Sequence, residues 1–148
     1  MRMKGVVYKA CVCSVLMYGT ETWAMKTGVF QRLRGTERRM LRKICGVTLK
    51  GMVESTVIAL GVGVNDLEEH LRQKRLRWFG HIARRDGEVE IRKVFDLKIE
   101  GRRKRGRPVK RWIDVVEEDM KKRGVVQQDA GDREDWRRRV VKGLANPR

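Results

Sequence analysis

A run of basic residues at positions 101–112, GRRKRGRPVKRW, most constrains how this chain can fold. Seven of the ten residues at 102–111 are Lys or Arg, and none is acidic. Like charges repel, and no apolar side chain precedes Val109, so the segment cannot fold on itself. The segment needs a polyanion as a partner. Contact between basic side chains and phosphates releases counterions, which favours DNA or RNA as that partner. The predicted contact residues here are Arg102, Arg103, Lys104, Arg105, Arg107, Lys110 and Arg111.

The centre of this run, KRGRP at 104–108, looks like an AT-hook. In that motif, arginines on either side of a glycine lie in a narrow minor groove, where the negative potential is enhanced. A solvated basic loop and a nuclear-import signal are the alternative interpretations. An intracellular, nuclear protein is therefore expected.

The excess of positive charge extends along the whole chain. The 148 residues carry a formal net charge of +17, with 13 basic and 6 acidic residues at 1–74 and 23 basic and 13 acidic at 75–148. This distribution favours an extended polyanion track over a single docking arm. Three cysteines without a CxxC pair argue against a disulfide framework or zinc finger and favour a reducing compartment. The apolar stretch at 6–18 is interrupted by Lys9 and is too short to span a bilayer.

Hydrophobic periodicity predicts a mainly α fold, a small bundle of about five helices with a basic loop. The helices are expected at 6–18, 30–45, 66–85, 108–123 and 132–144, and the first is apolar nearly all round, which predicts burial on several sides. A short helix at 54–60 and a short strand pair around 89–99 are also compatible with the pattern. We expect a helical region at 1–85, an irregular basic linker at 86–107 and a C-terminal helical pair at 108–148.

Local signals indicate where these helices begin and end. Asn65 and Asp132 are predicted N-caps, and Pro108 is a predicted first helical residue. Gly46 and Gly124 occupy positions typical of C-terminal caps. Glu37 falls on an apolar arc, so we expect it to pair with a base or to lie at the edge of the buried stripe.

The helix at 66–85 offers a second candidate contact surface. Its polar arc contains His70, Lys74, Arg77, His81 and Arg84. The two histidines are too far apart to share a metal ion, so either a phosphate-facing surface or a solvated charged face fits better. Lys74, Arg77 and Arg84 complete the predicted set of nucleic-acid-binding residues.

Other chemistry-bearing residues have structural explanations. Four carboxylates at 114–119 (Asp114, Glu117, Glu118 and Asp119) lie near the basic residues at 121–123, which favours surface ion pairs over catalysis. Three of the four tryptophans, Trp78, Trp112 and Trp136, fall on inward helical stripes and are predicted core anchors. The sequence shows no nucleophile with its base, no phosphate-binding glycine loop and no metal-ligand spacing. We therefore expect no catalytic residues, metal, cofactor or small-molecule substrate in this chain, and no membrane partner.

Five motifs taken together resemble the end of non-LTR retrotransposon reverse transcriptases of the RTE-like endonuclease–reverse transcriptase type. They are LMYGTETW at 16–23, RRMLRKICGVT at 38–48, KRLRWFGHIARR at 74–85, RRKRGRPVKRWID at 102–114 and DREDWRRRV at 132–140. The resemblance implies a thumb and C-terminal region, downstream of the polymerase palm, that is helical and grips template–primer or target DNA. The palm aspartates that hold two Mg²⁺ ions in that family match no position here.

The chain also departs from that family at two places. Cys13 and Ser14 stand where an Arg-Pro pair is usual, and LKGM at 49–52 replaces a charged segment. We hypothesise a decaying genomic copy that keeps a nucleic-acid-binding surface. The alternatives are an inert or interaction-only relic that packs against the missing palm, and a domesticated AT-hook-like chromatin protein.

Overall fold

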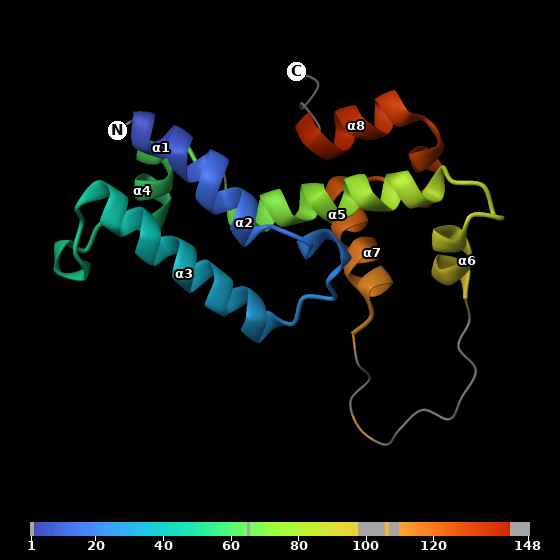
Figure 1. Ribbon diagram of the computed structural model, residues 1–148, viewed down its shortest axis with the longest axis horizontal. Coiled ribbons are helices and arrows are strands. Elements are labelled where there is room, and N and C mark those ends of the chain that lie inside the picture. Colours follow the sequence, from blue (N-terminus) through green and yellow to red (C-terminus); the bar gives the residue numbers. More distant parts are fainter. Residues whose placement is uncertain (1, 65, 98–105, 107–109, 143–148) are drawn as a thin grey trace. The chain divides into compact units, whose positions relative to one another are not determined.

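The computed structural model describes residues 2–64, 66–97, 106 and 110–142, with the side chains of 2, 141 and 142 left out (Figure 1). The predicted mainly α fold is confirmed, and the described residues contain no strand. The chain forms two compact units, a first unit of Met1–Leu71 and a second unit of Arg72–Arg148. The boundaries expected after residues 85 and 107 both fall inside the second unit.

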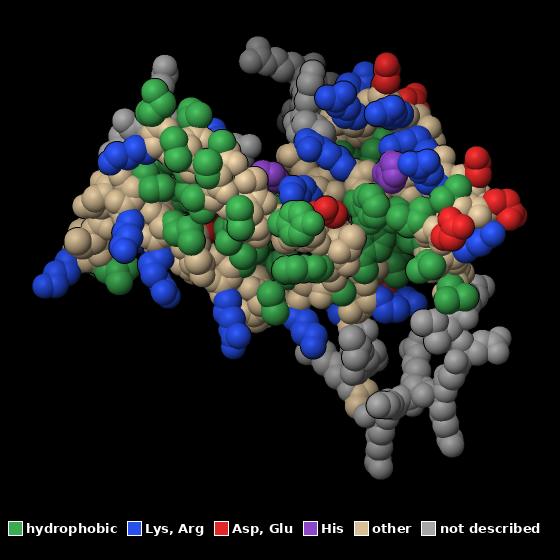
Figure 2. Space-filling view, viewed as in Figure 1, with side chains coloured by type: hydrophobic (Ala, Val, Ile, Leu, Met, Phe, Trp, Pro, Cys, Tyr) green, Lys and Arg blue, Asp and Glu red, His purple; other side chains and the backbone are tan. Residues whose placement is uncertain are grey.

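The N-terminal helical run consists of α1 (Arg2–Val7), a π-helical turn (Tyr8–Cys13) and α2 (Ser14–Leu16). Only one side of it is covered, where Tyr8, Cys13 and Met17 enter the core. The expectation of burial on several sides was wrong, because the opposite side exposes Met3, Val6, Val7, Val15 and Tyr18. Figure 2 shows hydrophobic side chains gathered over the N-terminal helices.

Helices α3 (Thr27–Cys45) and α4 (Ser55–Val62) complete the core of the first unit together with the start of α5. Gly46 ends α3 at a φ of 68°, as its position predicted, and its N–H contacts the carbonyls of Arg42 and Lys43. The short helix expected at 54–60 is present as α4. It lies so close to α1 that a Cβ on Gly5 would come within 2.2 Å of the Val62 carbonyl oxygen.

Glu37 is a buried carboxylate of the first unit, and it lines a cavity together with Arg34, Arg38 and Asp66. Burial raises its pKa above the ordinary value and the Asp66 carboxylate raises it further, while Tyr8, Arg34 and Arg38 lower it. Burial also raises the pKa of the Tyr8 hydroxyl, with the Glu37 carboxylate as the next cause. Arg34 and Arg38 are therefore the basic neighbours that the sequence called for, but burial has the larger effect on the carboxyl.

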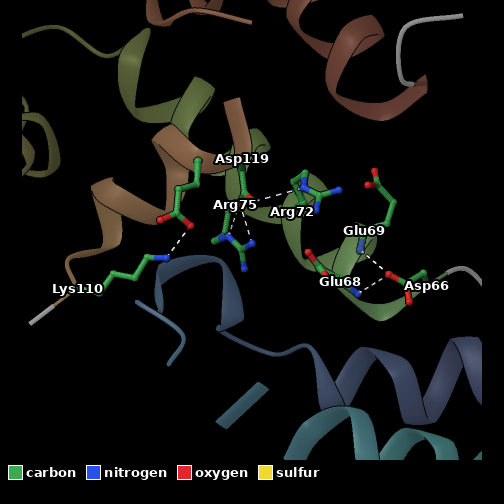
Figure 3. A network of polar contacts seen from close by, with 8 residues as sticks. Asp66, Glu68, Glu69, Arg72, Arg75, Lys110 and Asp119 are labelled. Atoms are coloured by element: carbon green, nitrogen blue, oxygen red, sulfur yellow. Dashed lines mark hydrogen bonds and ion pairs between the residues drawn. The ribbon is translucent and has the colours of Figure 1, made fainter. Parts of the chain in front are cut away.

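Helix α5 (Leu67–Ala83) contributes to both cores, Leu67 and Leu71 to the first and Leu76 and Phe79 to the second. Asp66 caps it through its carboxylate, which accepts the N–H groups of Glu68 and Glu69 at 3.1 and 3.3 Å (Figure 3). This is the position after the predicted cap, Asn65, which lies outside the described residues.

Residues 90–96 form α6 (Glu90–Asp96), so the strand pair expected around 89–99 is wrong over this stretch. Phe95 packs edge-on against Phe79 and Trp112, with ring centroids 5.9 and 6.1 Å apart. Arg92 adds an i,i+4 ion pair to Asp96 at 2.7 Å. Ile91, Val94 and Phe95 have helical spacing. In so short a segment, however, periodicity alone does not distinguish a helix from a strand.

The second unit is completed by α7 (Trp112–Arg123), a 3₁₀ turn (Gln127–Gly131) and α8 (Arg133–Lys142). Helix α7 begins four residues after Pro108, which lies outside the described residues, and Arg111 is its N-cap. Gly124 ends α7 at a φ of 63°, as predicted. Asp132 caps α8, as predicted, by accepting the N–H groups of Glu134 and Asp135 at 2.9 and 3.0 Å.

A buried ion pair between α5 and α7 was missed by the sequence analysis. The Arg75 guanidinium donates to Asp119 Oδ2 at 2.7 Å, and Arg72 Nε donates to Asp119 Oδ1 at 3.3 Å (Figure 3). Asp119 is therefore on the inner side of α7. Asp114 and Glu118 make surface ion pairs, as expected, but their partners are Arg111 and Lys110. Because Arg75 and Asp119 are both buried, loss of Asp119 would leave the Arg75 guanidinium without this partner.

The described helices include none that is long and apolar enough to cross a membrane.

Among the tryptophans, Trp136 is the core anchor that was predicted, since its side chain is only 2% exposed. Trp78 and Trp112 are half-buried, and Trp112 packs against the second core, so the prediction of both as core anchors was too strong.

Candidate nucleic-acid interface

The basic run at 101–112 is only partly described by the structure. Arg102, Arg103, Lys104, Arg105 and Arg107 lie outside the described residues, so their role stays a prediction. Lys110 and Arg111 are described, and both are ion-paired. Lys110 Nζ lies 2.6 Å from Glu118 Oε2, and Arg111 Nη2 lies 2.9 Å from Asp114 Oδ1.

Asp114 is tied to the start of α7 as well as to Arg111. Its Oδ2 accepts the backbone N–H of Arg111 at 2.8 Å. The side-chain hydrogen bond from Arg111 lowers the pKa of Asp114, and the backbone hydrogen bond lowers it further. Arg111 therefore serves the helix cap, and part of its charge is balanced by Asp114.

The polar arc predicted on the helix at 66–85 divides between two environments. Lys74 is half-buried, Arg77 is exposed, and Arg84 is half-buried with its Nη1 donating to the Ala130 carbonyl at 2.7 Å. His81 lies on the same side as Arg77 and Arg84. His70 lies in the first unit instead, with its Nδ1 3.9 Å from Cys13 Sγ.

Helix α8 brings two more arginines to the Arg77–Arg84 side of α5. Together they line a cavity of about 490 Å³, which we call the arginine cavity. Its lining residues are Arg77, His81, Arg84, Arg133, Trp136 and Arg137. None of them is acidic, and Figure 2 shows Lys and Arg side chains gathered beside a histidine on the second unit.

The packing of α8 on α5 fixes this cavity. The Trp136 indole N–H donates to the Leu76 carbonyl at 3.0 Å, and its ring lies 5.9 Å from that of Phe79. A Cβ on Gly80 would come within 2.5 Å of Trp136 Nε1, so only glycine allows this approach. Trp136 thereby sets the separation between the arginines of the two helices.

The electrostatics of the cavity are set by its closely spaced arginines. Burial lowers the pKa of Arg84, and the positive charge of Arg133 lowers it further. The nearby carboxylate of Asp135 is engaged on another side of α8, where it pairs with Arg138 and Arg139. A phosphate in the cavity would relieve the repulsion among its arginines.

Sequence reasoning grouped Arg77, His81 and Arg84 on one arc but did not connect them to Arg133 and Arg137. The available signal was the i,i+4 spacing of Arg133 and Arg137, which places both on one side of a helix. Pairing that side with α5 depends on Gly80 and Trp136, a contact between residues 56 positions apart that no local pattern reveals.

The Cys13–His70 contact is a thiol–imidazole pair that the sequence analysis did not foresee. Cys13 is buried in the first core, and its sulfur lies 3.9 Å from the ring nitrogen. Among the described residues, no group of three or more His, Cys, Asp or Glu side chains could hold a metal ion.

Comparison with known proteins finds a Caenorhabditis elegans protein whose name describes it as transposon-derived and uncharacterized. The two are 27% identical over 119 residues, a match that covers 77% of this chain and 43% of the relative. The chain thus spans less than half the length of the relative. No protein-family model matches the chain, and no solved structure gives a significant match.

Proposed function

We propose that this chain is a non-catalytic, nucleic-acid-binding piece of a transposon-derived protein. The observation that carries the proposal is the arginine cavity, where four arginines and a histidine from two helices converge without a lining carboxylate. Such a surface suits phosphates, whose neutralisation releases counterions. The similarity to a transposon-derived relative supports the origin.

We further propose that the parent was a non-LTR retrotransposon reverse transcriptase, with this chain from its thumb and C-terminal part. The support is the order of the five motifs at 16–23, 38–48, 74–85, 102–114 and 132–140. In this proposal the chain binds template–primer or target DNA, in the nucleus, and contributes no catalytic residue. The basic run and the arginine cavity are its two contact regions.

Fluorescence anisotropy of the purified chain tests the proposal, with duplex DNA, single-stranded RNA and an RNA–DNA hybrid over a salt series. We expect salt-steep binding to at least one of them. The variant Arg105→Ala with Arg107→Ala should weaken binding and flatten its salt dependence by about two phosphate contacts. Lys121→Ala with Lys122→Ala removes the same charge from α7 and is the control. Folded protein that binds none of the three would refute the proposal, and a strong preference for A/T-rich duplex would favour the AT-hook interpretation.

A second candidate function is protein interaction through the N-terminal helices. The exposed side chains of Met3, Val6, Val7, Val15 and Tyr18 form an apolar strip that a soluble surface rarely shows. The polymerase palm of the reverse transcriptase family is the partner that the resemblance implies. Sedimentation velocity tests this function by comparing wild type with the variant Val15→Ser combined with Tyr18→Ser. If the strip drives self-association of the isolated chain, wild type should form oligomers and the variant should sediment as a monomer. Wild-type protein that stays monomeric at high concentration would count against the apolar strip as an interaction surface.

A further inference from the structure

We propose that the arginine cavity holds the phosphates of an unpaired nucleotide whose base stacks on His81, so that the second unit selects single-stranded nucleic acid over duplex. This inference rests on the proposed nucleic-acid function and specifies its ligand. It follows from two features of one site, a concave ring of arginines and an aromatic pair at its margin.

The arginines supply the phosphate-binding part. Arg77 and Arg84 come from α5, and Arg133 and Arg137 come from α8. Each guanidinium has five N–H donors, of which Arg84 uses one on the Ala130 carbonyl. The cavity volume of about 490 Å³ lies within the range of roughly 300–1,000 Å³ found for ligand sites. The site can therefore contact a compact anion from both helices, whereas a flat basic face would contact it from one side only.

The aromatic part is a preformed stack of His81 on Trp78. Their ring centroids are 5.4 Å apart and their planes differ by 19°. Trp78 is half-buried, while His81 is exposed and lines the cavity. Arg85 Nε donates to His81 Nε2 at 3.4 Å and helps to hold the imidazole in place. The exposed ring is thus ordered from both Trp78 and Arg85, as a stacking platform must be.

This combination discriminates between paired and unpaired bases. A duplex presents phosphates to the arginines, but its bases are already stacked on both faces. A single strand presents phosphates together with an open base face, and stacking on aromatic side chains is the usual way that proteins bind it. Only a single strand can therefore engage the arginines and His81 at once.

The test is anisotropy of the full chain with a labelled single-stranded DNA oligonucleotide and with the duplex of the same sequence. His81→Ala should lower single-strand affinity by roughly 5- to 150-fold, the range for loss of one stacked base, and change duplex affinity by less than about twofold. His81→Phe keeps an aromatic ring and should retain single-strand binding. Rescue by Phe separates stacking from loss of fold.

The phosphate part is tested with Arg133→Ala combined with Arg137→Ala, against Lys121→Ala with Lys122→Ala as the control of equal charge. The arginine variant should reduce the salt slope of single-strand binding by about 1.4, and the control should change affinity far less. Inorganic pyrophosphate serves as a competitor. If it bound wild type as tightly as the oligonucleotide, the cavity would be a site for free phosphate anions and the proposal would be overturned.

The remaining outcomes separate this inference from the proposed function. Wild-type binding with equal effects of the arginine and lysine variants, or with no selective effect of His81→Ala, overturns the assignment of the cavity but leaves nucleic-acid binding by the basic run. Wild-type protein that binds neither oligonucleotide overturns the proposed function, and the inference with it.

Discussion

The two units bury and expose opposite kinds of side chain. The first unit buries a carboxylate, Glu37, and exposes an apolar strip on its N-terminal helices. The second unit buries a tryptophan and a matched ion pair, Arg75 with Asp119, and exposes a cluster of arginines. An exposed apolar strip is suited to contact with another protein surface, whereas exposed arginines are suited to a polyanion.

The difference also concerns how each unit handles charge in its interior. Asp119 has two guanidinium partners, so its negative charge is compensated where it is buried. Burial dominates the titration of Glu37 despite its basic neighbours. The second core therefore contains a carboxylate whose charge is compensated by two arginines. The first unit buries a carboxyl whose pKa is raised.

The largest expected effect comes from removing the charge that holds the second core. Asp119→Ala leaves Arg75 buried without its partner and should cost about 3–5 kcal/mol in the free energy of unfolding. Chemical denaturation followed by tryptophan fluorescence measures it. The control, Glu118→Ala, removes an exposed carboxylate on the same helix and should cost only about 0–1 kcal/mol. Equal losses for the two variants would show that Asp119 is not buried as described.

Gly80→Ala should have the next largest effect, because its new Cβ would meet Trp136 Nε1 at 2.5 Å. Overpacking of this kind costs about 1–3 kcal/mol. Gly35→Ala in α3 is the control, since nothing lies within 4 Å of its Cβ, and it should gain about 0.5–1 kcal/mol from helix propensity. Thermal melts by circular dichroism compare the two variants, and a stabilised Gly80→Ala protein would rule out the close approach of α8 to α5.

The Glu37 carboxyl should give the first unit an unusual pH dependence. Its pKa is raised in the folded chain, so the folded state binds the proton more tightly than the unfolded state. The contribution of Glu37 to stability is greatest below its unfolded pKa and is lost as pH rises through its folded pKa. Glu37→Gln, which resembles the protonated form, should remove that decline, as hydrogen exchange of α3 between pH 4 and pH 8 would show. An unchanged decline in the variant would assign it to another group.

The smallest expected effect, with the opposite sign, is that of Asp132 in the second unit. Backbone hydrogen bonds from Asp135 and Glu134 lower its pKa, so its contribution to stability is present above the unfolded pKa and is lost as pH falls through the folded pKa. Asp132→Ala should fray α8 at neutral pH and leave less acid dependence there. Amide exchange in the first turn of α8 measures this, and protection equal to wild type would mean that the cap contributes nothing.

Helix existence and many helix ends were predictable because they depend on local chemistry. The apolar period of α3, the left-handed glycines Gly46 and Gly124, and the Asp132 cap all act within a few residues of sequence. The start of α7 was not predicted, since Asp114 captures the Arg111 backbone N–H and sets the cap there. Residues 90–96 were misassigned because their helix depends on Phe95 packing against distant rings.

Half of the candidate site was predictable, because half of it depends on local helix spacing. One helix face supplied Arg77, His81 and Arg84 from the sequence alone, whereas Arg133 and Arg137 join them only through tertiary packing. Likewise, charge pattern alone placed Asp119 among surface carboxylates. Its burial requires Arg75 from a helix 44 residues earlier, and sequence spacing does not encode such pairing.

The packing around the arginine cavity is more sensitive to mutation than its charge, because it depends on Gly80. Every missense change in a glycine codon adds at least a Cβ, and here that atom would collide with Trp136. An arginine codon, in contrast, can change to lysine and keep its positive charge. A drifting genomic copy would therefore lose the close packing of α8 on α5 while its charge still looked intact. Across related loci, glycine retained at this position would reveal whether the folded second unit is still in use.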